Sequence, residues 1–183
     1  LQEFNKDQIL PSEDDKAFRK QLTHGMVHDQ GAAMLGGVSG HAGLFSNAND
    51  IASIFQMLLN RGEYAGKKIL KSSTISKFTS KQKDGNRRGL GFDKPLNKAG
   101  SGPTSEYASG ETFGHTGFTG TCIWADPKYD LIYVFLSNRV YPTSNNNKLA
   151  LNIILSLEAL TVLSFFTDTN QGLGKYPISA IFV

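Results

Sequence analysis

Residues 114–121 read Gly114-His115-Thr116-Gly117-Phe118-Thr119-Gly120-Thr121, and a hairpin pattern follows directly. Two apolar runs, 119–125 and 131–137, are separated by Asp126-Pro127-Lys128-Tyr129-Asp130. Pro after Asp, between β-branched and aromatic runs, is typical of a turn that joins antiparallel strands. Three glycines at three-residue spacing weaken strand packing and let a ligand or another backbone come close. We therefore expect residues 113–137 to form consecutive antiparallel strands with an approach surface beside His115 and Thr116.

Upstream of this stretch, residues 47–61 predict an amphipathic helix. Asn47 is placed as its N-cap, Asp50 as the N3 partner, and Arg61-Gly62 closes it. One helical stripe carries Ile51, Ile54, Phe55, Leu58 and Leu59. A shorter helix is expected from Ser72 or Ser73, with Ile75 and Phe78 on one side.

Downstream, residues 148–166 form an apolar stretch that includes Asn152, Ser156 and Glu158. A membrane span needs about 20 predominantly apolar residues, so we expect a core helix lying across the sheet and no membrane span. The pattern as a whole predicts an α+β fold, an antiparallel sheet packed by helices, in a single domain of residues 1–183. Its expected parts are an irregular glycine-rich segment (1–46), a helical segment (47–82), a surface excursion (83–110) with a strand-like piece at 89–92, strands plus a C-terminal helix (113–166), and an unassigned tail (167–183).

Composition excludes several classes of function. The formal net charge is only +3, and Lys and Arg are scattered, with Arg87-Arg88 read as solvated surface. Nucleic-acid binding would need a concentrated basic face, so none is expected. The single cysteine, Cys122, excludes an internal disulfide framework and predicts a buried thiol within an apolar run. No signal peptide follows Leu1, and the absence of a starting Met suggests a chain that begins partway through a longer one.

Other polar constellations are weaker. His24 and His28, with Asp29 adjacent, have the spacing of metal ligands on a helix, but nearby glycines argue against a helix and no third ligand is placed. We therefore expect no metal and no cofactor. His41 lies in a glycine turn, where a hydrogen-bonded loop role is the default. A Ser109–His115–Asp126 triad can be assembled on paper, but no G-x-S-x-G elbow supports it.

The order of these segments resembles the serine β-lactamase and penicillin-binding-protein family, in its class C-like esterase and peptidase branch. Before the amphipathic helix stands Ser39-Gly40-His41-Ala42-Gly43-Leu44-Phe45-Ser46-Asn47-Ala48-Asn49-Asp50-Ile51-Ala52, which is similar to the family's glycine-rich segment. Gly89-Leu90-Gly91-Phe92 and Trp124-Ala125-Asp126-Pro127 also match, and the resemblance covers roughly residues 25–160. It implies a partial β-lactamase/transpeptidase-like fold.

The resemblance also implies roles for the H-T-G strand. Gly114, His115, Thr116 and Phe118 would contact the substrate, and the Phe118 N–H would be one donor of an oxyanion hole. Gly117 would be small so that the substrate can lie along the strand edge. The family's usual Lys is replaced by His115, so a carboxylate held by the charged imidazole should bind more weakly as pH rises through about 6.5.

The family's nucleophile motif, S-x-x-K, has one literal match before this strand, and that match is not in the far-upstream place the family requires. The literal match Ser80-Lys81-Gln82-Lys83 stands in an exposed-looking segment and is read as a decoy, and Ser144-Asn145-Asn146 follows the H-T-G strand, in the wrong order for the S-x-N motif. We expect both true motifs in a missing N-terminal portion of the same polypeptide, so this chain alone should be inactive.

The resemblance leaves several substrates open for the whole enzyme. β-Lactams, D-amino-acid peptides and esters all fit, and a cell-wall substrate would place the enzyme in the periplasm or elsewhere outside the cytoplasm. The sheet edge left by the missing portion would invite pairing into a homodimer. The alternative is a non-catalytic binding or scaffold module whose glycine-rich strand is purely structural.

Overall fold

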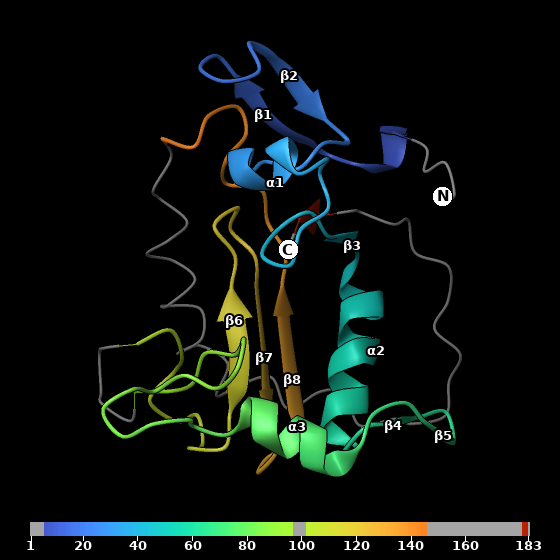
Figure 1. Ribbon diagram of the computed structural model, residues 1–183, viewed down its shortest axis with the longest axis vertical. Helices are drawn as coiled ribbons and strands as arrows, with labels where there is room; N and C mark the ends of the chain where they lie inside the picture. The colour runs from blue at the N-terminus through green and yellow to red at the C-terminus, as the bar shows by residue number, and fades with distance from the viewer. Residues whose placement is uncertain (1–5, 97–101, 146–180, 183) are drawn as a thin grey trace.

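The computed structural model describes residues 6–96, 102–145 and 181–182, and its centre is a three-stranded antiparallel sheet (Figure 1). The strands are β6 (Phe113–Thr116), β7 (Cys122–Asp126) and β8 (Leu131–Phe135), in the order β6-β7-β8. His115 lies opposite Ile123, which in turn lies opposite Val134. The predicted strands, their hairpin and the α+β class are confirmed. Within the described residues, the outer edge of β8 pairs with no further strand.

Helix α2 (Ala48–Leu59) packs on one face of this sheet and makes the main core (Figure 1). Buried Ile51 and Phe55 meet Phe113, Ile123 and Ala125 from the strands. The predicted N-cap is confirmed, because the Asn47 side chain accepts the Asp50 N–H at 3.0 Å. The predicted stripe is wrong at one position: the Ile54 side chain remains exposed.

The opposite face of the sheet carries a smaller apolar cluster. Cys122 and Trp124 are buried there, with Tyr133 and Phe135 packed against them. Burial raises the pKa of the Cys122 thiol to about 12, so the thiolate is disfavoured at neutral pH. The predicted buried thiol is confirmed.

Below the sheet, α2 is followed by the short hairpin β4 (Glu63–Tyr64) and β5 (Lys67–Lys68), then α3 (Ser72–Thr79). Residues 89–92 are not a strand. Their chain instead delivers Phe92 to the core, where its ring meets Phe55 and Phe113 edge-on, and Asp93 forms a single bridge to Gly114. Buried Lys94 then donates to the carbonyls of Thr79, Glu111 and Thr112, tying the end of α3 to the start of β6.

The N-terminal segment differs from the expected irregular loop. It contains η1 (Lys6–Gln8), an antiparallel hairpin of β1 (Pro11–Asp15) and β2 (Gln21–His24), α1 (Gln30–Met34) and β3 (Phe45–Ser46). Asp15 organises the hairpin turn, because its carboxylate accepts N–H groups from Ala17, Phe18 and Arg19. These bonds, the Phe18 N–H foremost, hold the pKa of Asp15 below its usual range.

The expected helix at 148–166 lies outside the described residues, as does nearly all of the 167–183 tail. From that tail, β9 (Ile181–Phe182) pairs antiparallel with β3. In the part of the chain that the structure describes, no helix has the length and apolar character needed to cross a bilayer.

Candidate active-site cleft

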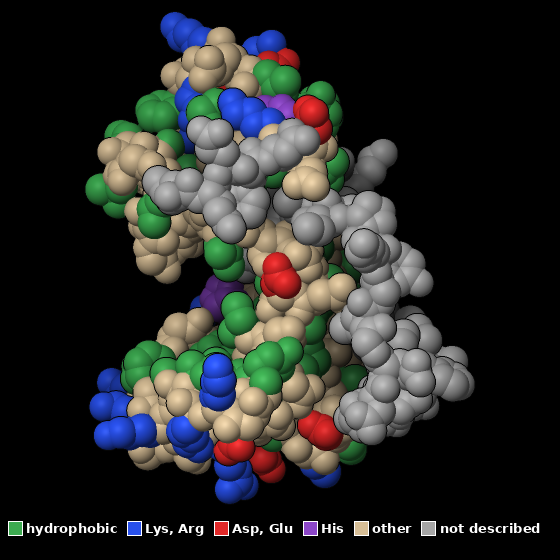
Figure 2. Space-filling model, turned by 90° about the vertical axis from the view of Figure 1, so that its right-hand side faces the viewer, with side chains coloured by type: hydrophobic (Ala, Val, Ile, Leu, Met, Phe, Trp, Pro, Cys, Tyr) green, Lys and Arg blue, Asp and Glu red, His purple; other side chains and the backbone are tan. Residues whose placement is uncertain are grey.

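A hollow of about 790 Å³ separates the N-terminal hairpin and α1 from the sheet (Figure 2). Figure 2 shows it as a notch between the upper and lower parts of the molecule, with histidine atoms (purple) at its floor. Three segments line it: residues 27–31, the glycine turn 39–44, and the strand end and turn 115–119. The four H-T-G-F positions, His115 to Phe118, therefore meet the glycine-rich segment in one cleft.

The end of β6 presents two polar side chains to this cleft. His115 and Thr116 are both exposed, although the two preceding strand residues are buried. The Thr116 hydroxyl has no hydrogen-bond partner among the described residues, so it is free to bind a ligand. Gly114 is buried beneath them, and its lack of a side chain matters: a Cβ there would lie 2.0 Å from the Ile123 carbonyl oxygen.

Arg88 contacts His115 from the loop that follows α3. Its Nη1 lies 2.9 Å from His115 Nε2, while His115 Nδ1 lies 2.7 Å from the Thr116 carbonyl oxygen. A guanidinium only donates and a carbonyl only accepts, so this pattern requires Nδ1–H and a free lone pair on Nε2. The imidazole can therefore accept from Arg88 at Nε2 and donate from Nδ1 to the Thr116 carbonyl, and Arg88 brings a positive charge beside it.

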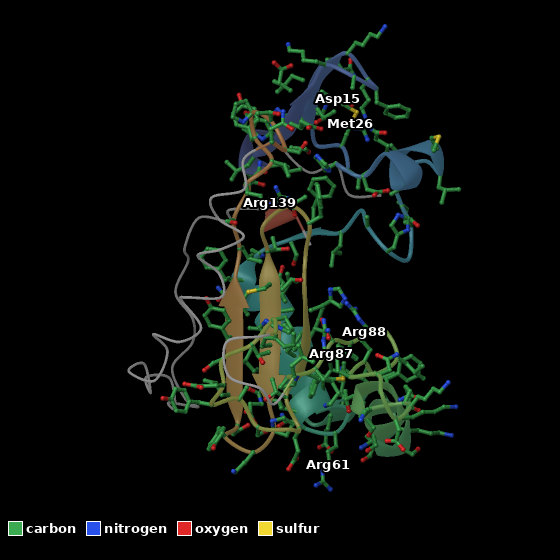
Figure 3. The ribbon with its side chains drawn as sticks, turned by 90° about the vertical axis from the view of Figure 1, so that its left-hand side faces the viewer. Asp15, Met26, Arg61, Arg87, Arg88 and Arg139 are labelled. Carbon is green, nitrogen blue, oxygen red and sulfur yellow. The ribbon has the colours of Figure 1, made fainter. Side chains whose placement is uncertain are left out.

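Asp93 holds Arg88 in place. Its buried carboxylate is bidentate to Arg87, with contacts of 2.6 and 2.7 Å, and lies 3.4 Å from Arg88 Nη2. Burial acts to raise the pKa of Asp93, but the Arg87 hydrogen bond, the Lys94 N–H and both guanidinium charges together lower it. The backbone of Asp93 also exchanges hydrogen bonds with Gly114, which fixes the arginine loop against β6. Figure 3 shows Arg87 and Arg88 side by side at this edge.

The turn after Thr116 contains Phe118, whose N–H the family resemblance predicts to be an oxyanion donor. The Gly117 N–H donates to the Thr121 carbonyl at 2.7 Å, and the Gly120 N–H donates to the Gly117 carbonyl at 3.0 Å. The Phe118 N–H donates to no group in the described residues, and Phe118 lines the cleft. Gly117 has a reason for its size that the sequence did not show: a Cβ there would lie 2.3 Å from the Thr121 hydroxyl oxygen.

The other wall holds a second hydrogen-bonded histidine. His41 Nε2 lies 3.0 Å from Asp29 Oδ1, and His41 Nδ1 lies 2.8 Å from the Ser39 hydroxyl. Asp29 is also the N-cap of α1; the Ala32 N–H, followed by the His41 bond, holds the pKa of its carboxyl below the usual range. These bonds pin the glycine turn to α1, which is the hydrogen-bonded loop role expected for His41.

The remaining candidates do not come together, although His28 itself lines the cleft. His24 Nε2 contacts the Lys6 and Ile9 carbonyls, and His28 Nε2 lies 3.1 Å from Glu13, so the two rings do not converge on a metal position with Asp29. Ser109 and Thr112 donate hydrogen bonds to buried Asp126. His115 contacts Arg88 instead of Asp126, so the Ser109–His115–Asp126 triad does not form.

The two decoy motifs also lie outside the cleft. Ser80 caps the end of α3, and neither it nor Lys83 lines the cleft. Ser144 and Asn145 follow the sheet and do not line it either, and Asn146 lies outside the described residues.

Arg88 and Asp93 are the site residues that the sequence did not reveal. Arg88 lies 27 residues before His115, in a stretch without apolar periodicity, and its contact exists only because Asp93 pairs with Gly114 across the fold. The adjacent Arg87-Arg88 pair beside a strand-like segment was the only available signal, and it is common on surfaces.

Comparison with known proteins gives consistent matches. The family model described as Beta-lactamase matches residues 5–158. A protein of Salmonella agona named "Putative D-alanyl-D-alanine carboxypeptidase" is 39% identical over 139 residues, and proteins of the same name from Salmonella gallinarum and Salmonella typhi are 38% identical over 139 residues. Each match covers 75% of this chain and 32% of the relative, so the chain spans about a third of the length of the curated relatives it matches.

Proposed function

The chain belongs to the Beta-lactamase family, and on that premise we propose that it forms one wall of the active site of a serine hydrolase that cleaves D-alanyl-D-alanine peptides. The observation that carries the proposal is the cleft itself, which is lined by His115, Thr116 with its unpartnered hydroxyl, and Phe118, while Arg88 contacts His115. A cation and a free hydroxyl suit a substrate carboxylate, and a free amide N–H suits a developing oxyanion.

Each residue then has a distinct role. Thr116 donates its hydroxyl to the terminal carboxylate of the peptide, and Arg88 supplies the positive charge beside it. His115 bridges the two by accepting from Arg88 and donating to the Thr116 carbonyl, so it orients both partners. The Phe118 N–H stabilises the tetrahedral intermediate after a serine attacks the scissile carbonyl.

The nucleophile belongs, in this proposal, to a part of the protein outside the given sequence. The only literal S-x-x-K before β6 is Ser80-Lys81-Gln82-Lys83, and its exposed Ser80 does not line the cleft. A serine hydroxyl would form the acyl bond, pass its proton to the lysine of that motif, and release D-alanine as the leaving group; water would then hydrolyse the ester. The relatives' greater length leaves room for this segment.

The test uses the intact protein that contains this chain and measures D-alanine release from an N-acylated peptide ending in D-Ala-D-Ala. A matched peptide ending in a carboxamide is the comparison. The carboxylate peptide should be cleaved at least about tenfold faster in kcat/KM, because a charge-assisted hydrogen bond contributes about 1.5–3 kcal/mol. Thr116→Val should remove most of this preference. Equal turnover of the two peptides would refute the carboxylate-binding role proposed for Thr116 and Arg88. Reversible binding without turnover would favour the non-catalytic scaffold alternative.

A substrate of this class lies in the cell wall, so we propose an extracytoplasmic location. Fractionation of source cells should recover the protein with periplasmic or surface material, and recovery in the cytoplasmic fraction would count against this.

A further inference from the structure

The turn that carries the Phe118 N–H is held by a separate segment, residues 137–142, here called the strap. Three successive carbonyls of the turn each accept a hydrogen bond from it. Ser137 Oγ donates to the Gly120 carbonyl, the Arg139 N–H donates to the Thr119 carbonyl at 2.9 Å, and Arg139 Nε donates to the Phe118 carbonyl at 2.7 Å. The Gly120 N–H donates to the Gly117 carbonyl, so each of the four carbonyls from 117 to 120 accepts a hydrogen bond.

Arg139 also fixes the side chain of Phe118. Its guanidinium lies 4.4 Å from the centre of the Phe118 ring, and the His28 ring lies 5.5 Å away. Arg139 is buried although it is charged, while Phe118 stays largely exposed at the cleft. One arginine therefore contacts both the backbone carbonyl and the ring of Phe118, whose N–H is the proposed oxyanion donor.

The strap is anchored at its other end. Asn138 Nδ2 donates to the Pro11 carbonyl at 2.6 Å, and the Pro142 carbonyl accepts the Asp14 N–H at 3.0 Å. Close approach of strap and turn depends on Gly120, which has φ +103°; a Cβ there would lie 2.6 Å from Ser137 Oγ and 3.2 Å from Arg139 Cβ. The turn is thus tied through the strap to the N-terminal hairpin.

We propose that Arg139 is a positioning residue for the oxyanion donor: by holding the carbonyls and ring around the Phe118 N–H, it keeps that N–H in one orientation. The proposal rests on the proposed function. A preorganised donor stabilises charge in the transition state more than in the ground state, so loss of the clamp should lower kcat and spare KM. Figure 3 places Arg139 near one end of the sheet and Arg61 near the other, so Arg61, an exposed arginine, provides a control for the same substitution away from the turn.

The experiment compares Arg139→Lys with Arg61→Lys in the intact protein, by peptide hydrolysis and by hydrogen exchange followed by mass spectrometry. Lysine keeps the positive charge but lacks the planar guanidinium, which can donate to the Phe118 carbonyl and stack on the Phe118 ring at the same time. Arg139→Lys should lower kcat by roughly 10- to 100-fold with KM changed by less than about twofold, and should speed exchange at 117–121 alone. Arg61→Lys should change neither.

Each other outcome decides the matter. Unchanged exchange at 117–121, or an unchanged kcat in an active enzyme, overturns the proposal. If Arg139→Lys loosens the whole chain, Ser137→Ala becomes the deciding variant and must show the same local exchange and loss of kcat. If the wild-type protein hydrolyses no peptide, the proposed function fails and the catalytic role falls with it, while exchange still reports whether Arg139 holds the turn.

Discussion

Arg88 lies against His115 with its Nη1 2.9 Å from Nε2, and this contact decides how the cleft should respond to pH. The sequence alone suggested that a charged His115 holds the substrate carboxylate. In the structure, Nε2 faces a cation that can only donate, so protonating the ring would place two positive charges together. The fixed charge therefore belongs to Arg88.

A prediction about Arg88 follows from this contact. For a carboxylate substrate, the guanidinium supplies a charge that does not change with pH, because it stays protonated throughout. Arg88→Gln should lower kcat/KM by about tenfold at every pH, a modest loss because Arg88 is half exposed and solvent screens it. A decline of kcat/KM with rising pH that persists in Arg88→Gln would indicate that His115, and not Arg88, supplies the positive charge that binds the carboxylate.

The buried Asp93 carboxylate can be tested through its contribution to the stability of the fold. Asp93→Asn should lower the free energy of unfolding by about 2–4 kcal/mol at neutral pH, since it leaves Arg87 without its buried partner. The pKa of Asp93 is lowered on folding, so its contribution is complete above the unfolded value of about 3.9 and is lost as pH falls through the folded value.

The gap between wild type and Asp93→Asn should therefore narrow below about pH 4 in urea unfolding curves. Asp84→Asn is the control, because Asp84 is fully exposed and its only ion pair within the described residues is a 3.8 Å contact to Lys81. If the difference in unfolding free energy between wild type and Asp93→Asn stays constant across the acid range, the charge of the Asp93 carboxylate does not stabilise the loop that carries Arg87 and Arg88.

Among the elements, those with a strong local pattern were predictable from sequence and the N-terminal hairpin was not. Helix α2 and the β7–β8 hairpin carry apolar periodicity, a cap and a turn signal within their own residues. Strand β1 reads Pro-Ser-Glu-Asp-Asp, which is polar and lacks alternation. Its turn depends on Asp15, and Arg19 secures the hairpin by donating to the Val27 carbonyl at 2.8 Å, a contact between parts of the chain that no local pattern encodes.

The candidate site follows the same division. Positions 114–118 could be proposed from sequence because glycine spacing and a resemblance mark them within one short stretch. Arg88, Asp93 and Arg139 were missed because each acts through a partner that only the fold brings near, and an isolated arginine in a loop carries no signal of burial or contact.

Strand β6 offers a test of packing at the element scale. Gly114→Ala would place a Cβ 2.0 Å from the Ile123 carbonyl oxygen and 2.7 Å from Trp124 Cε3, both in the neighbouring strand β7. We expect a loss of about 1–3 kcal/mol in unfolding free energy and a shift in the emission of Trp124, the single tryptophan of the chain. Gly40→Ala, whose Cβ would meet nothing within 4 Å, should leave both unchanged. Native stability and emission in Gly114→Ala would show that β6 and β7 are further apart than described.

At the scale of the whole molecule, we propose that the described residues form a cleft wall that recognises substrate but does not attack it. One side carries Thr116 and Phe118, with Arg88 in contact with His115, and the facing side carries the Asp29–His41–Ser39 network, so polar groups stand on both walls. Lys94, Asp93 and the strap connect these walls to the sheet by hydrogen bonds. What the cleft lacks in this sequence is an activated serine.

Covalent labelling with a fluorescent penicillin, with the adduct located by peptide mass spectrometry, tests this division most directly. The intact protein should carry the adduct on a serine of an S-x-x-K motif outside the present sequence, and the isolated 183-residue chain should remain unlabelled. An adduct at Ser80, or on any serine of the isolated chain, would contradict the division between recognition and attack. Failure of the intact protein to label or to hydrolyse the peptide would contradict the assignment of a serine hydrolase.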